Sequence, residues 1–378
     1  MGPGDHGNSP RPGPVEVIGE SSDEDSAPLV RSAPKKARVT RRDPALEVFA
    51  RRSREERVEL FWSFVVEAVR GTSSSEPLCQ KYELGGIVPF VADVRTVIEE
   101  VLLPFHGNLP EQLWRVMLVV WLGGGGPGFG TYRHVTSGAP LCGEACPPAA
   151  RLPGLADGTD VAPMFEHLRG LAERHGRCAV LSGDGTAVKF RFSANQGLEV
   201  LRAWRQCAQE LLARVGGSAH GLETLGVWGL YRHFRGFPFL ADLSIKEIFC
   251  YLYPAYPHAV DVNRFIPVGA GARRGGATVL GYGDRDTDAR DWHEEFRKML
   301  AEVPAHLGAR LAEAIRARGG AYEFCGDPRV PGVLRQVAAA KPTAADVEVC
   351  MCFFMNFLKA KHCGSAPVGW RMLERSQW

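Results

Sequence analysis

Asp261 is one of three carboxylates that lie between two segments predicted to bind phosphate, and it is the one closest to the second segment. Asp261 follows a tight turn at 234–238 and precedes a glycine-rich segment at 269–276, in which Arg273 and Arg274 are adjacent. An ionised aspartate beside a sugar can stabilise an oxocarbenium-like centre or orient a nucleophile. Asp261 is therefore the first candidate for a catalytic residue. The alternative is that it only caps the turn that follows it.

The two flanking segments have the composition of phosphate-binding elements. A helix that begins after a tight turn presents unpaired backbone N–H groups to an anion. In the second segment, glycines permit a loop that wraps a phosphate, and the paired arginines supply forked donors. The two phenylalanines of the turn either wedge between bases or belong to the core. The predicted DNA- or phosphate-binding residues are Gly236, Phe237, Phe239, Gly269, Gly271, Arg273 and Arg274.

Helices must position these residues, because apolar side chains recur at helical spacing along most of the chain. The first helix starts after Asp43, which is followed by proline, and stops at Gly71. One exception is the segment 178–192, where Asp-Gly between alternating residues predicts a small β-hairpin. The sequence thus predicts a mostly α fold, with further helices at 88–103, 111–122, 161–175, 197–215, 222–234, 239–252, 288–302, 304–318 and 343–362.

Composition limits the class of protein. The chain has 378 residues, of which 45% are hydrophobic, and a formal net charge of +2, as in an ordinary globular protein. It has no apolar run long enough to span a membrane and no signal-peptide pattern, so we expect no membrane partner. Its ten cysteines lack the spacing of a zinc ribbon or iron–sulfur loop. We therefore predict reduced, buried thiols, no metal and no cofactor.

Residues 1–42 form a predicted disordered tail, because they hold too little apolar surface to offset the entropy of ordering. Val15, Val17 and Ile18 precede an acidic, serine-bearing run, and this pattern resembles a SUMO-interacting motif. The alternative is an apolar patch without a partner. The basic run at 35–42 resembles a nuclear localisation signal, and the alternatives are a phosphate-binding arm or a solvated tail.

The remaining chain, 43–370, is predicted to form a single helical domain with a long loop at 123–158. That loop begins with four consecutive glycines, and a connection of this length is often functional or an insertion. The pattern Gly-x-x-x-x-Gly-Lys-Ser/Thr does not occur in the sequence, so a P-loop nucleotide site is not predicted.

The block at 236–275 carries a family resemblance. Gly236-Phe237-Pro238-Phe239-Leu240-Ala241, followed by Val268-Gly269-Ala270-Gly271-Ala272-Arg273-Arg274-Gly275, resembles the α-glutamyl/putrescinyl thymine pyrophosphorylase clades and the helical domain of 5-hydroxymethyluracil DNA kinases. These families are similar to the helix-hairpin-helix DNA glycosylases. The resemblance implies a DNA-glycosylase-like helical fold. It also implies that Asp261, in Val-Asp-Val-Asn, is the catalytic aspartate and that Glu247 is a second acidic candidate, for which the alternative is a solvated helix residue.

The resemblance implies a nuclear protein that acts on or recognises a modified pyrimidine in DNA, of the 5-hydroxymethyluracil type. Three function classes are open: a glycosylase using Asp261, a transferase in which Arg273 and Arg274 hold the leaving pyrophosphate, and a non-catalytic DNA-binding chromatin adaptor on the same fold. The family pattern has acids and a lysine where this chain has Phe353, Met355 and Asn356. That departure favours the adaptor.

Overall fold

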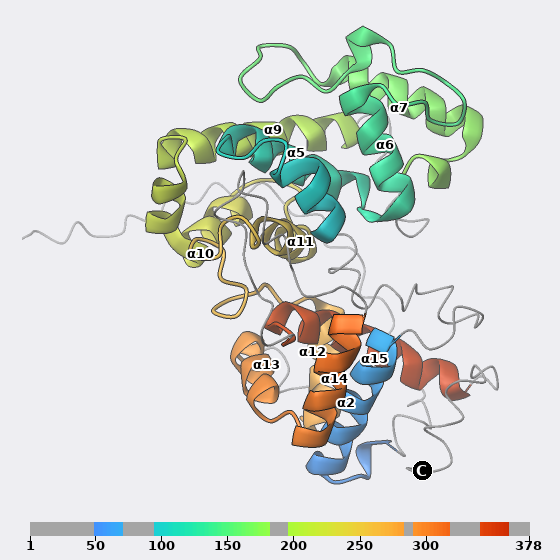
Figure 1. Cartoon of the computed structure of the whole chain (residues 1–378), viewed down its shortest axis with the longest axis vertical. Coiled ribbons are helices and arrows are strands. Elements are labelled where there is room, and N and C mark those ends of the chain that lie inside the picture. The colour runs from blue at the N-terminus through green and yellow to red at the C-terminus, as the bar shows by residue number, and fades with distance from the viewer. Residues whose placement is uncertain (1–48, 71–93, 182–195, 283–289, 318–340, 363–378) are drawn as a thin grey trace, which may run out of the picture. The chain divides into compact units, whose positions relative to one another are not determined.

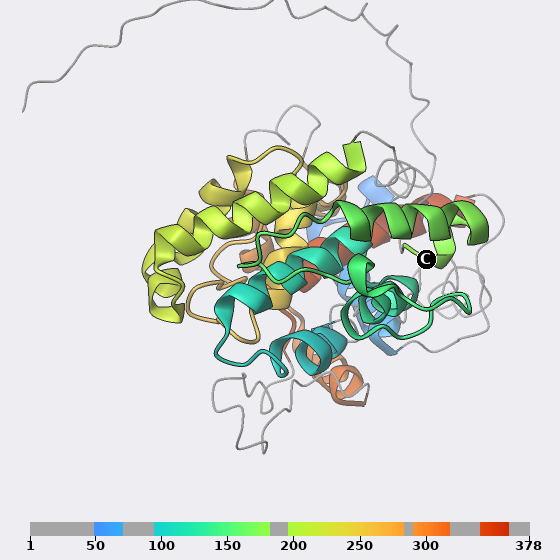
Figure 2. The same cartoon turned by 90° about the horizontal axis from the view of Figure 1, so that it is seen from above.

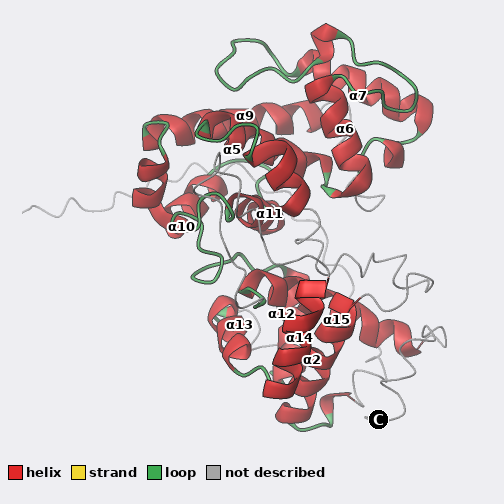
Figure 3. Ribbon diagram, viewed as in Figure 1, coloured by secondary structure: helices red, strands yellow, loops and turns green. Residues whose placement is uncertain are grey.

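The computed structural model describes residues 49–70, 94–181, 196–282, 290–317 and 341–362. The chain divides into two units, 1–42 and 43–378, and all described residues lie in the second. They are mostly helical and include no strand (Figure 3), which confirms the mostly α prediction. None of the described helices is long and apolar enough to cross a membrane.

Three sequence predictions fall on other residues. The SUMO-interaction-like motif at 15–18 and the basic run at 35–42 lie outside the described residues. So does most of the predicted β-hairpin, from residue 182 onward, while Arg177–Ala179 at its start forms a short 3-10 turn, η4. These predictions stay predictions.

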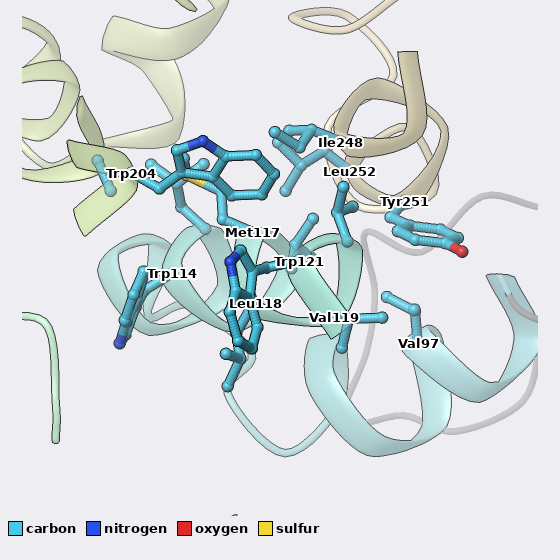
Figure 4. Close-up of a cluster of buried hydrophobic side chains, with 14 of the residues drawn as sticks. Val97, Trp114, Met117, Leu118, Val119, Trp121, Trp204, Ile248, Tyr251 and Leu252 are labelled. Carbon is cyan, nitrogen blue, oxygen red and sulfur yellow. The ribbon is translucent and has the colours of Figure 1, made fainter. Parts of the chain in front are cut away.

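The first hydrophobic core is built around α5 (Leu109–Leu122). Asn108 caps this helix by accepting a hydrogen bond from the Glu111 amide at 3.2 Å, and Gly123 ends it with φ 89°. Trp114, Met117 and Trp121 are among its many buried residues, as expected for a helix covered on several sides (Figure 4). The elements that share this core are η2 (Ile98–Leu102), α6 (Gly125–Ser137), α7 (Ala162–His175), α9 (Gln196–Val215), α10 (Ala219–Arg235) and α11 (Asp242–Leu252); α9 runs beside α5 (Figure 2).

A second hydrophobic core collects the N-terminal and C-terminal described helices. It contains α2 (Arg54–Arg70), α12 (Ala270–Leu280), α13 (Trp292–Ala301), α14 (Ala305–Ala317) and α15 (Ala344–His362), with α2 against α12, α14 and α15 (Figure 1). Phe354 is at its centre, with ring centroids of Phe49, Phe61 and Phe64 at 5.4, 5.6 and 5.2 Å. The apolar residue at 354 thus has a packing role.

The predicted loop at 123–158 is wrong in its first half, because α6 occupies 125–137. Glycine disfavours a helix, but Phe129, Tyr132 and Val135 recur at helical spacing and are all buried in the first core. This burial outweighs the intrinsic propensity. The rest of the segment is irregular apart from the short turn η3 (Pro148–Ala150) and one isolated bridge between Leu141 and Glu144.

A buried ion pair joins elements of the two cores. Lys246 on α11 donates to Glu348 on α15 at 2.6 Å, and both side chains are less than a tenth exposed. The other carboxylate oxygen of Glu348 accepts the backbone N–H of Gly269 at 3.0 Å, at the start of α12. Burial acts to lower the pKa of Lys246, but the Glu348 charge keeps this pKa above its ordinary value. Three helices therefore meet at one carboxylate.

Breaking this pair should destabilise the fold strongly. Lys246→Met or Glu348→Gln alone leaves a buried charge without its partner and should cost about 3–5 kcal/mol of unfolding free energy. The double variant should cost less than the sum, because it removes both charges and keeps an oxygen for the Gly269 amide. Urea unfolding of all four proteins measures the coupling.

The matched control is the exposed pair Arg297–Glu294 on α13, whose removal should change stability little. If the Lys246 and Glu348 variants unfolded no earlier than that control, the pair would have no structural role.

Candidate nucleic-acid interface

The structure contains a helix–turn–helix at the predicted place. α10 ends at Arg235, and the Gly236 amide donates to the carbonyls of Arg232 and His233 at 3.2 and 3.1 Å. α11 then begins at Asp242, three residues later than the predicted start at 239. The delay has a local cause, because Phe239 has a left-handed φ of 66°, which does not fit into a right-handed helix.

Large apolar side chains are exposed along this turn. Among the described residues, the exposed large apolar side chains are Trp228 (48%), Phe239 (44%) and Leu243 (57%), and all lie between 228 and 243. The left-handed backbone at Phe239 costs roughly 1–2 kcal/mol, and such strain is concentrated at functional sites. We call these residues, with Tyr231, Arg235 and Arg273, the hairpin patch.

The Trp228 ring stacks on the buried side chain of Phe265. Its centroid lies 3.8 Å from that of Phe265, with 35° between the planes, and Tyr231 meets the same Phe265 ring at 4.9 Å. Phe265 is itself buried. A break in α10 at Gly226 (φ 65°, ψ 172°), a conformation essentially restricted to glycine, precedes Trp228 by two residues. The Trp228 ring is therefore held in place and still presents surface to solvent.

Charged groups surround the aromatic rings of the hairpin patch. The Tyr231 hydroxyl donates to Asp242 Oδ1 at 3.0 Å, and Arg235 Nε lies 3.7 Å from the same oxygen. Burial, then this hydrogen bond, raises the pKa of Tyr231, while the positive charges of Arg235 and Arg273 act in the opposite direction. Tyr231 thus remains a hydroxyl donor at neutral pH. Arg273 is close enough to act on Tyr231, so the structure brings the start of α12 to the hairpin patch.

The predicted glycine/arginine loop at 269–276 is wrong, because these residues form the cap and first turns of α12. A Cβ on Gly271 would lie 2.7 Å from Cys352 Sγ, and one on Gly276 would lie 2.5 Å from the Trp292 ring. These glycines allow α12 to approach α15 and α13 closely. The Gly269 amide, expected to face a phosphate, donates to Glu348 instead. Arg274 is exposed on α12.

Asp261 forms the cap that was the alternative to catalysis. Its Oδ1 accepts the backbone N–H groups of Asn263 and Arg264 at 3.0 and 3.2 Å. Its Oδ2 has no hydrogen-bond partner within the described part of the chain. The Phe265 amide donates to the Asp261 carbonyl at 3.0 Å. Asp261 is therefore one turn of chain from Phe265, the residue on which Trp228 stacks. Glu247, the second acidic candidate, is half-buried on α11 and acts electrostatically on Lys246.

Sequence reasoning did not select Trp228, Lys246 or Glu348. Trp228 has a weak signal, since it follows an isolated glycine within a helical pattern. Lys246 and Glu348 have a clearer signal, because each is a charged residue at a core position of an otherwise apolar helix face.

The hydrogen bonds that Asp261 accepts should contribute to the stability of the fold, and this contribution can be measured. Asp261→Ala removes an acceptor for two backbone N–H groups and should lower the unfolding free energy by about 1 kcal/mol, whereas Asp261→Asn keeps an acceptor oxygen and should change it by a few tenths. Thermal and urea unfolding of both variants give these values. Equal losses for the two variants would contradict the cap.

Comparison with protein-family models, with curated proteins and with solved structures finds no match. The function of the chain is therefore argued from its own geometry: an exposed, stacked tryptophan, nearby arginines, and a half-buried aspartate one turn away.

Proposed function

We propose that the chain binds DNA through the hairpin patch and holds an unstacked base against Trp228. The observation that supports this most directly is that the exposed large apolar side chains of the described residues gather on one turn. Scattered exposed apolar residues are ordinary, but a local group of them marks an interaction site. Single-stranded or flipped bases bind to aromatic faces of this kind.

The charges of the hairpin patch favour a nucleic acid over an apolar peptide. Arg235 and Arg273 lie around Tyr231, and Arg232, Arg264 and Arg274 are exposed on the neighbouring elements. Arginines beside an aromatic platform can contact the phosphates on either side of a base that stacks on the ring. In this proposal the arginine side chains carry the phosphate contacts, since the Gly269 amide is bonded to Glu348.

The identity of the base belongs to the proposal as well. The resemblance at 236–275 suggests a modified pyrimidine of the 5-hydroxymethyluracil type, on a helix-hairpin-helix, DNA-glycosylase-like fold. The basic run at 35–42 suggests a nuclear location. Val15, Val17 and Ile18 suggest a contact with SUMO, as the sequence predicts. On this basis the chain is a DNA-modification protein or a chromatin adaptor.

Binding should depend on the tryptophan ring and on the arginines in separable ways. Trp228→Ala should weaken binding to a labelled duplex with one central 5-hydroxymethyluracil by about 5- to 150-fold, because stacking of one base contributes roughly 1–3 kcal/mol. Changing Arg273 and Arg274 to alanine should lower the slope of log affinity against log salt by roughly 0.9 for each lost phosphate contact. Fluorescence anisotropy over a salt series measures both.

Two controls separate stacking from loss of structure. Trp228→Phe keeps an aromatic face and should bind better than Trp228→Ala, and Arg297→Ala on α13 should leave the salt slope unchanged. Wild-type affinity in Trp228→Ala, or an unaltered salt slope without Arg273 and Arg274, would reject the proposed surface.

A second candidate function is catalysis by Asp261, favoured by the unpartnered Oδ2 one turn from Phe265. In that case the carboxylate stabilises positive charge at the sugar as the base leaves, or assists transfer to the base. Asp261→Asn should then lower single-turnover rates by about 100-fold or more while DNA affinity stays the same.

Mass spectrometry of the products distinguishes the classes. Free base identifies a glycosylase, a new adduct identifies a transferase, and binding without turnover leaves the adaptor. Wild-type turnover in Asp261→Asn would remove Asp261 from the mechanism and leave Glu247 as the acidic candidate.

A further inference from the structure

A cluster of metal-ligating side chains lies away from the hairpin patch, among elements of the first core. His134 on α6, Cys146 in the connection after α6, and His167 on α7 bring one ligand atom each to within 4.8 Å of the others. His134 and Cys146 are buried, and His167 is half-buried. We call these three residues the His/Cys cluster. In the sequence they are separated by 11 and 20 residues and follow no compact zinc motif, so spacing could not identify them.

The hydrogen bonds of His134 fix which of its nitrogens can bind a metal. Its Nδ1 lies 2.7 Å from the carbonyl oxygen of Ala139. A carbonyl only accepts, so Nδ1 carries the proton and Nε2 presents a lone pair to the cluster. A backbone carbonyl bonded to the outer nitrogen is the usual arrangement around metal-binding histidines. His167 Nε2 lies 2.8 Å from His134 Nε2 and therefore donates its proton in the metal-free form.

The spacing of the three atoms fits a tetrahedral zinc ion after small side-chain movements. With Zn–N near 2.1 Å and Zn–S near 2.3 Å, donor atoms around one ion are about 3.3–3.6 Å apart. The metal-free distances run from 2.8 Å between the histidines to at most 4.8 Å, which brackets that range. Two imidazoles and a thiolate favour zinc over magnesium or calcium, which prefer oxygen.

We propose that His134, Cys146 and His167 bind a zinc ion, with water in the fourth position. On binding, Cys146 releases its thiol proton to solvent, and His167 carries its ring proton on Nδ1 so that Nε2 becomes a ligand. The ion would tie the irregular connection at 138–161 to α6 and α7. Glu144 already attaches this connection to the end of α7, through Arg174 at 2.7 Å and His175 at 2.6 Å, and so holds Cys146 near the histidines.

Cobalt provides a direct probe, because Co²⁺ replaces Zn²⁺ in such sites and gives a thiolate charge-transfer band in the near ultraviolet. The full chain, freed of metal by a chelator, should bind one equivalent of Co²⁺ with that band, and added Zn²⁺ should abolish it. Cys146→Ser and His167→Ala should each weaken binding at least about 10-fold, the lower bound seen when even an outer-shell partner is lost. Melting temperature should rise with Zn²⁺ in the wild type, and much less in Cys146→Ser and His167→Ala.

The matched control is Cys142→Ser, which removes an exposed thiol four residues from Cys146 and should bind Co²⁺ as the wild type does. Far-ultraviolet circular dichroism of each metal-free variant checks that the helices remain. The proposal is overturned if the wild type takes up no Co²⁺, or if Cys146→Ser and His167→Ala bind it as tightly as the wild type.

Discussion

The buried contact between Lys246 and Glu348 is the constraint on which the candidate interface depends. The Glu348 carboxylate on α15 accepts hydrogen bonds from Lys246 on α11 and from the backbone N–H of Gly269, the residue that caps α12. A buried charge is strongly destabilising when its partner is absent. A shift of one of the three helices that separated the pair would therefore lower the free energy of unfolding by several kcal/mol, about 3–5 by the general estimate. This contact fixes the start of α12, and with it the position of Arg273 relative to the α10–α11 turn.

Packing of small residues has a similar consequence. Gly271 and Gly276 allow α12 to lie against Cys352 and Trp292 at distances that any side chain would prevent. The glycine-rich segment is therefore helical and closely packed, and Arg273 and Arg274 lie on this packed helix and not on a loop. A surface of this kind limits the conformational entropy lost on binding, compared with a flexible loop that must become ordered around its ligand.

Periodicity was sufficient to predict most of the helices, and it was misleading where glycine is frequent. α9 and α15 begin and end within one residue of their predicted limits, and α11 ends at its predicted residue, because apolar spacing predicts these helices well. The sequence predicts loops where α6 and α12 form, because glycine has a low helix propensity. The packing of Phe129 and the close approach at Gly276 stabilise these helices, but such contacts between distant segments cannot be inferred from local propensity. The candidate site was predicted in part: Arg273 does approach the hairpin, whereas Trp228 and the partner of the Gly269 amide depend on contacts between distant segments.

The backbone at Phe239 has an evolutionary implication. A glycine at this position would adopt φ 66° without strain, and a chain selected for stability alone would be expected to carry one. The phenylalanine at this position is 44% exposed, so burial of its ring compensates only part of that strain. Natural sequences carry such locally destabilising residues mainly at surfaces that bind a ligand or partner. Among related chains, we therefore expect the identity of the residue at this position to vary with the ligand that each chain binds, and not with the temperature at which each chain works.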